Sequence, residues 1–207
     1  VAESLQGPTG EAWPVKYLRT RLHQEPASRH PMHEFVVEHD DYGPSRQLQT
    51  SIDPDGGQTA LLHVVGPDPE PYTEALASVP SVLEWAVTDG RGDGFYVYAR
   101  DALDDAGQGL LAAFDRPGLL VMRPVVYRTD GTIEVAVVGS TAVVQATLES
   151  LPDGTAADVV ELGSYEAHRL ETASSLTERQ FAAVEAALAC GHYQEPREGT
   201  VEDVADH

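Results

Sequence analysis

An internal repeat is the sequence feature that most limits how this chain of 207 residues can fold. The segment Val64-Val65-Gly66 recurs 73 positions later as Val137-Val138-Gly139, and a helical pattern follows each copy. The segment Ser78-Val79-Pro80 recurs 72 positions later as Ser150-Leu151-Pro152. A repeat of this length indicates one supersecondary unit that is used twice.

Hydrophobic periodicity predicts the same order in each copy, which is strand, helix, strand, strand, helix, strand. In the first copy we expect strands over 15–22, 47–52, 59–65 and 82–87, and helices that begin at His30-Pro31 and Asp68-Pro69. In the second copy we expect strands over 95–99, 119–127, 133–138 and 157–162, and helices capped by Asp101 and Ser140. This order is the split βαβ arrangement. The predicted fold class is therefore α+β, with tandem ferredoxin-like (βαββαβ) repeats.

The chain divides into four segments on these patterns. We expect a flexible leader over 1–13, a first repeat over 14–90, a second repeat over 91–165 and a helical segment over 174–207. The glycine-rich stretch 90–94 lies between two strands rather than at the start of a helix, so we interpret it as a linker and not as a nucleotide-binding loop. By analogy with amino-acid-sensing ACT domains, we expect the repeats to lie side by side with a ligand groove between them.

The charge balance indicates adaptation to concentrated salt. Acidic residues number 34 against 13 basic ones, which gives a formal charge of -21. At about 1 M salt the Debye length is roughly 3 Å, so the self-repulsion of such a surface is screened. The alternative is an ordinary acidic protein. No basic stripe marks a nucleic-acid surface. No signal peptide or membrane-spanning run is visible, so we expect a cytoplasmic protein that does not enter membranes.

The segment 174–207 carries the start signals of two helices. Thr177 and Gln180 form a capping box, and Leu176 with Phe181 form a hydrophobic staple around it. Gly191 follows the first helix at the position where a left-handed residue is favoured. These signals predict one complete helix and the beginning of another.

This segment resembles the bacterio-opsin activator type helix-turn-helix family of haloarchaeal regulators. The resemblance rests on Leu-Thr-Glu-Arg-Gln over 176–180, on Gly-His-Tyr-Gln-Glu-Pro-Arg over 191–197, and on Val-Glu-Asp-Val-Ala over 201–205. His192 departs from the family pattern, which has tyrosine there. A less specific resemblance to the sensor region of such regulators covers His30-Pro31-Met32 and the segment 124–128.

The resemblance implies a sequence-specific DNA-binding transcription regulator with a truncated helix-turn-helix domain. The sequence stops at His207, within the first helix of the pair, so the recognition helix that enters the major groove is expected to lie beyond it. Arg197 and the helix start at Thr200 are candidates for phosphate contacts, because helix N-termini bind anions. The alternative for Arg197 is a solvated linker residue.

No motif in the sequence supports catalysis, a metal or a cofactor. Nucleophile elbows, phosphate-binding lysine loops and zinc-protease motifs are all missing. The histidines at 23, 30, 33 and 39 form no i,i+4 pair, so we interpret them as solvated or capping residues rather than metal ligands. Cys190 is a candidate redox sensor, but a lone cysteine is more often a small buried residue. We therefore expect no enzyme, no cofactor and no metal.

Three hypotheses of function remain. The first is a transcription regulator, expected as a homodimer, whose repeat region senses a small-molecule effector or a partner and controls DNA binding. The second is a dimerisation or protein-docking module without ligand sensing. The third is an enzyme on a ferredoxin-like fold, which would need convergent titratable groups in a pocket.

Overall fold

The strands and helices follow one another in the repeated order that the sequence predicts. The computed structural model describes residues 15–53, 57–90 and 92–164. The strands are β1 (Val15–Gln24), β2 (Ser45–Ile52), β3 (Gln58–Val65), β4 (Val82–Asp89), β5 (Gly94–Asp101), β6 (Leu119–Tyr127), β7 (Thr132–Ser140) and β8 (Thr155–Ser164). The helices are η1 (Pro26–Ser28), α1 (Pro31–Glu38), α2 (Pro69–Ser78), α3 (Asp105–Phe114) and α4 (Thr141–Glu149). The predicted leader 1–13 and the predicted helix-turn-helix segment 174–207 lie outside the described residues.

Side-chain caps at their N-termini start the α-helices, mostly where the sequence predicts them. His30 accepts a hydrogen bond from the Met32 amide before α1, and Asp68 and Ser140 cap α2 and α4. The prediction for α3 is wrong, because Asp104 rather than Asp101 caps it. Asp101 is instead the last residue of β5 and is buried. In the sequence, Asp101 and Asp104 can each cap a helix. Strand β5 continues through Asp101, beyond its predicted end at residue 99, so Asp104 is left as the cap of α3.

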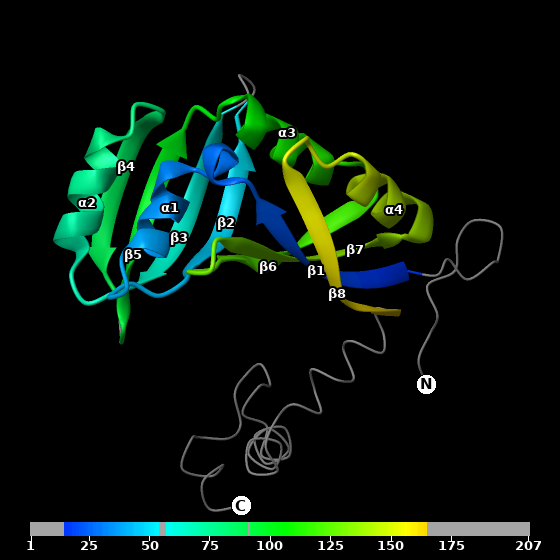
Figure 1. Cartoon of the computed structure of the whole chain (residues 1–207), viewed down its shortest axis with the longest axis horizontal. Helices are drawn as coiled ribbons and strands as arrows, with labels where there is room; N and C mark the ends of the chain where they lie inside the picture. The colour runs from blue at the N-terminus through cyan, green and yellow to red at the C-terminus, as the bar shows by residue number, and fades with distance from the viewer. Residues whose placement is uncertain (1–14, 54–56, 91, 165–207) are drawn as a thin grey trace, which may run out of the picture. The chain divides into compact units, whose positions relative to one another are not determined.

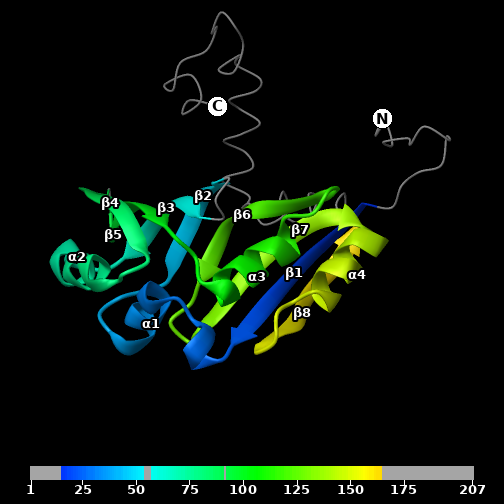
Figure 2. The same ribbon diagram turned by 90° about the horizontal axis from the view of Figure 1, so that it is seen from above.

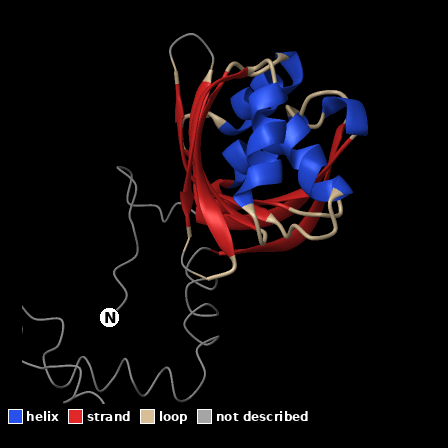
Figure 3. Ribbon diagram, turned by 90° about the vertical axis from the view of Figure 1, so that its left-hand side faces the viewer, coloured by secondary structure: helices blue, strands red, loops and turns tan. Residues whose placement is uncertain are grey.

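The strands form one antiparallel sheet in the order β4-β5-β3-β2-β6-β7-β1-β8. The sheet curves, and helices α1 to α4 lie on its concave side, as Figure 3 shows. Helices α1 and α2 cover the part of the sheet around β3 and β5, and α3 and α4 cover the part around β7 and β1 (Figures 1 and 2). No helix among the described residues is long and apolar enough to cross a membrane.

Two strands are exchanged between the two halves of this sheet. Strand β1 lies between β7 and β8, whereas β5 lies between β3 and β4. The halves of the sheet are therefore not formed by the consecutive segments 14–90 and 91–165 that the sequence predicts. Strand β1 belongs with the strands of the second segment, and β5 belongs with those of the first. The hydrophobic periodicity of a strand shows which of its faces is buried but not which strand it pairs with. The exchange of β1 and β5 therefore cannot be predicted from that periodicity.

The hydrophobic cores show the same exchange. One core joins Phe35 and Leu76, from helices of the first segment, to Phe95 and Val97 of β5. The other core includes Leu18 and Leu22 of β1 together with residues of the second segment, namely Leu119, Val125, Ile133, Val135, Val137 and Val144. Each core therefore includes a strand from the other segment of the chain, and neither core is complete without both segments.

The two halves meet at a short seam between β2 and β6. Only three residue pairs join these strands, from Ser45 opposite Tyr127 to Gln47 opposite Val125. Both strands are irregular nearby, with register shifts between Gln47 and Gln49 and between Met122 and Val126. The sheet is therefore continuous but most weakly paired where its halves join.

A disulfide test follows from the exchange of β1 and β5. Arg21 of β1 lies opposite Glu134 of β7. Cα atoms of directly opposite residues in an antiparallel pair are about 4.5–5.5 Å apart, which suits a disulfide. In a Cys190→Ser background, the double variant Arg21→Cys/Glu134→Cys should form an intramolecular disulfide, seen by mass spectrometry without reductant. The control Arg21→Cys/Leu61→Cys tests pairing of β1 with β3. A disulfide in the control alone would show that β1 is not exchanged.

Candidate functional site

A cavity of about 430 Å³ lies at the junction of the two halves of the sheet. Its wall combines side chains of α1, α2 and α3 with side chains from the concave face of the sheet. Its apolar members include Leu62, Leu76, Val97, Leu110, Val125 and Ile133. The volume falls within the roughly 300–1,000 Å³ range of small-molecule sites, which are mostly apolar with a few placed polar groups. The sequence predicts a groove between two repeats, and the cavity does draw its wall from both segments.

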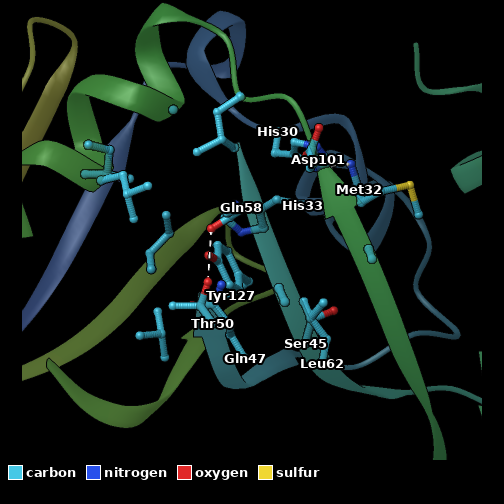
Figure 4. A pocket seen from close by; sticks show the side chains of 18 of the residues that line it. His30, Met32, His33, Ser45, Gln47, Thr50, Gln58, Leu62, Asp101 and Tyr127 are labelled. Atoms are coloured by element: carbon cyan, nitrogen blue, oxygen red, sulfur yellow. Dashed lines mark hydrogen bonds and ion pairs between the residues drawn. The ribbon is translucent and has the colours of Figure 1, made fainter. Parts of the chain in front are cut away.

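A histidine–aspartate pair lies where the two crossing connections meet. His30 ends the connection from β1 to α1, and Asp101 begins the connection from β5 to α3. The Nδ1 atom of His30 accepts from the Met32 amide at 3.2 Å, so its proton is on Nε2. That Nε2 lies 2.6 Å from Oδ2 of Asp101 (Figure 4). The pair therefore joins the two exchanged connections directly.

The carboxylate of Asp101 is stabilised by its partners. Burial would raise its pKa, but hydrogen bonds from His30 and from Ser81 lower the pKa below its usual value. Asp101 therefore remains ionised although it is only 6% exposed. The prediction of a helix-capping role missed this contact, because the sequence does not show that residues 71 positions apart meet.

The buried ring of His33 forms part of the cavity wall. Its Nε2 donates to the backbone carbonyl of Arg128 at 3.0 Å, which leaves Nδ1 unprotonated in the neutral ring. This Nδ1 is buried and has no hydrogen-bond partner among the described residues. Burial lowers the pKa of His33, and the nearby charge of Arg29 lowers it further. The prediction that His33 is solvated or capping is wrong, since the residue is 4% exposed.

A cationic group faces the cavity from the seam. The guanidinium of Arg123 donates to Oε1 of buried Gln47 at 2.5 Å. No described carboxylate lies within ion-pairing distance of Arg123, and Tyr127 is its one described electrostatic neighbour. Burial lowers the pKa of Arg123, but guanidinium groups stay charged in proteins. The sequence analysis did not select Arg123, although its inward position can be read from the alternation of Leu119, Val121, Arg123, Val125 and Tyr127 along the strand.

Thr50, Gln58 and Tyr127 are further polar members of the wall. The hydroxyl of Thr50 donates to Oε1 of Gln58 at 3.4 Å, as the dashed line in Figure 4 shows. The ring of Tyr127 meets the ring of His33 edge to face, with centroids 5.3 Å apart. Burial raises the pKa of Tyr127, so its hydroxyl remains protonated and can donate. The wall therefore offers hydrogen-bond donors and acceptors within an apolar enclosure.

The other residues selected from the sequence lie elsewhere. His23 pairs with Asp158 at 2.9 Å on the surface, and His39 bonds to the Phe35 carbonyl at 2.8 Å. Arg197, Thr200 and Cys190 lie outside the described residues. No group of three metal-ligating side chains converges within the described part of the chain.

The sequence shows the family of this domain. Residues 30–165, well over half of the chain, match the model of a haloarchaeal family of N-terminal domains, HVO_0513_N. The chain belongs to this family. No curated protein matches the sequence. The match spans α1 to β8 and so includes nearly all of the cavity wall.

Replacement of Asp101 tests the pair at the crossing. Asp101→Asn removes a charge-assisted hydrogen bond from a buried site, so we expect unfolding to become easier by about 1–3 kcal/mol. The control Asp158→Asn disrupts a similar pair at a site where the carboxylate side chain is 76% exposed, and it should change stability by less than about 0.5 kcal/mol. Urea unfolding of both variants in molar KCl gives the comparison. Equal losses would contradict a special role for the buried pair.

The stability of the domain should fall as the pH drops below about 6.5 because of His33. Its pKa is lower in the folded state than the ordinary value of about 6.5 in the unfolded chain. Between the folded-state and unfolded-state pKa values of His33, the unfolded chain binds more protons than the folded one. The contribution of neutral His33 to folding stability is therefore complete above about pH 6.5 and is lost as the pH falls toward the folded-state pKa. His33→Gln should reduce this slope in unfolding curves measured from pH 7.5 to 5. An unchanged slope would show that His33 protonates equally in both states.

Proposed function

We propose that residues 15–164 form the ligand-sensing domain of a transcription regulator. A small molecule binds in the cavity at the seam and changes how a C-terminal helix-turn-helix domain binds DNA. The observation that carries this proposal is the cavity itself, whose wall comes from both segments and places the guanidinium of Arg123 in an apolar enclosure. A ligand there contacts both halves of the sheet across its weakest junction.

The DNA-binding part of the proposal is supported by the sequence. The motifs over 176–205 resemble the bacterio-opsin activator type helix-turn-helix, and the family of the domain is described as N-terminal and haloarchaeal. The recognition helix would follow His207, with Arg197 and Thr200 beside the phosphates. The charge of -21 then favours recognition through base contacts and shape, since counterion release contributes less at high salt.

We propose binding rather than catalysis for the cavity. The two histidines of its wall are held by structural contacts, since His30 caps α1 and His33 donates to the Arg128 carbonyl. Within the described residues, neither imidazole bonds to a serine or threonine hydroxyl of the kind that nucleophilic catalysis uses.

A protein-docking or dimerisation module is the second candidate. None of the described helices lies on the convex face of the sheet. Leu61, Tyr96 and Tyr98 are exposed on the neighbouring strands β3 and β5 of this face. An exposed apolar patch of this kind is typical of interaction surfaces. A homodimer formed through it would be compatible with a cavity on the concave side.

DNA footprinting with blocked cavities tests the sensor proposal. A chain extended beyond His207 should protect DNA upstream of its own gene in molar KCl, and a small-molecule extract of haloarchaeal cells should change that protection. Ala99→Phe fills part of the cavity, so its protection should no longer respond to the extract. Ala86→Phe is the matched control, because exposed Ala86 lies on the adjoining strand and is not part of the cavity wall.

The outcomes separate the two candidates. A response that persists in Ala99→Phe would place sensing outside the cavity. An extended chain that protects no DNA, with or without extract, would instead favour the docking module.

A further inference from the structure

We propose that the ligand of the cavity is a small monocarboxylate with an apolar body, and that Arg123 binds its carboxylate. This inference rests on the proposed function of the cavity and specifies the chemistry of its ligand. It is carried by a cation that faces an apolar enclosure without an acidic partner among the described residues.

The strand geometry directs Arg123 into the cavity. Residues at alternate positions of β6 face the same side, and the neighbours of Arg123 on that side are Val121 and Val125. Both valines line the cavity, and Val125 belongs to the adjacent core. A charged residue at this position is costly to bury unless it is paired. The position is therefore explained more readily by a ligand than by packing.

Most N–H donors of the Arg123 guanidinium have no hydrogen-bond partner among the described residues. Gln47 accepts one hydrogen bond from Nη1, while a guanidinium has five N–H donors arranged for bidentate binding of a carboxylate. Gln47 is buried at the seam and is only 5% exposed, so it fixes the orientation of the Arg123 side chain. Tyr127, which interacts electrostatically with Arg123, can supply a further donor from its protonated hydroxyl.

The rest of the wall limits the charge and polarity of the ligand. Most of the lining is apolar, so the remainder of the ligand is a hydrocarbon chain or ring. Asp101 and Asp104 also line the cavity and disfavour anions of higher charge, such as phosphates. One cation in an apolar cavity with acidic residues on its wall suits a single carboxylate.

Calorimetric titration with matched pairs of compounds tests the inference. Hexanoate, 4-phenylbutyrate and phenylacetate are compared with their primary amides, in molar KCl and with the full chain. Charge-assisted hydrogen bonds contribute about 1.5–3 kcal/mol, and each 1.4 kcal/mol is tenfold in affinity. At least one carboxylate should therefore bind about tenfold or more tightly than its amide.

Variants of two arginines identify the group responsible. Arg123→Gln should remove the preference for carboxylate over amide, and Arg123→Lys should retain part of that preference. Arg46→Gln is the control, because Arg46 lies at the same seam, adjacent to inward-facing Gln47 in β2 and therefore on the opposite face. Melting curves show whether each variant is folded.

Each outcome has a separate meaning. Carboxylate preference that depends on Arg123 supports the inference. Equal affinity for acids and amides, blocked by Ala99→Phe, would overturn the choice of a carboxylate while the cavity remains a ligand site. Carboxylate preference that survives in Arg123→Gln would overturn the role of Arg123. Binding of neither acids nor amides would also overturn the inference, and footprinting would then decide the sensor proposal independently.

Discussion

The antiparallel pairing of β1 with β7 and of β5 with β3 is the constraint on which the rest of the structure depends. It requires the chain to cross between the halves of the sheet after each of these strands. The two crossings meet at the contact between His30 and Asp101, and both cores are completed by exchanged strands. Two segments that could each have formed a separate sheet are thereby joined into one folded unit, and the space beside their crossing becomes a shared cavity.

The position of the cavity at the seam allows a ligand to affect how the two halves of the sheet are joined. Strands β2 and β6 share only three residue pairs, and the residues that line the cavity there include Gln47, Arg123 and Tyr127. A ligand that binds Arg123 adds contacts where the sheet has fewest, so it can alter how the two halves are held together. If the two halves of the sheet have two relative arrangements, a ligand shifts the equilibrium between them only by the difference between its affinities for each. That makes the contacts at the seam more important than the total apolar area of the wall.

Local patterns in the sequence predicted the elements but not their pairing. The order of strands and helices and the caps at His30, Asp68 and Ser140 follow from short-range signals. The exchange of β1 and β5 depends on long-range pairing, which alternating hydrophobicity does not encode. The burial of His33 and the contact of His30 with Asp101 could not be predicted for the same reason. Arg123 is different, because a charged residue at an inward-facing position of a predicted strand is visible in the sequence itself.

A crystal structure of the protein grown in molar KCl with its tightest-binding carboxylate would test the central claim most directly. We expect electron density for the ligand inside the cavity, with its carboxylate oxygens about 2.7–2.9 Å from the guanidinium nitrogens of Arg123. Its apolar body should contact side chains of both segments, such as Leu62 and Ile133. An empty cavity, with the ligand bound on the convex face of the sheet, would contradict the account and would favour a docking surface there.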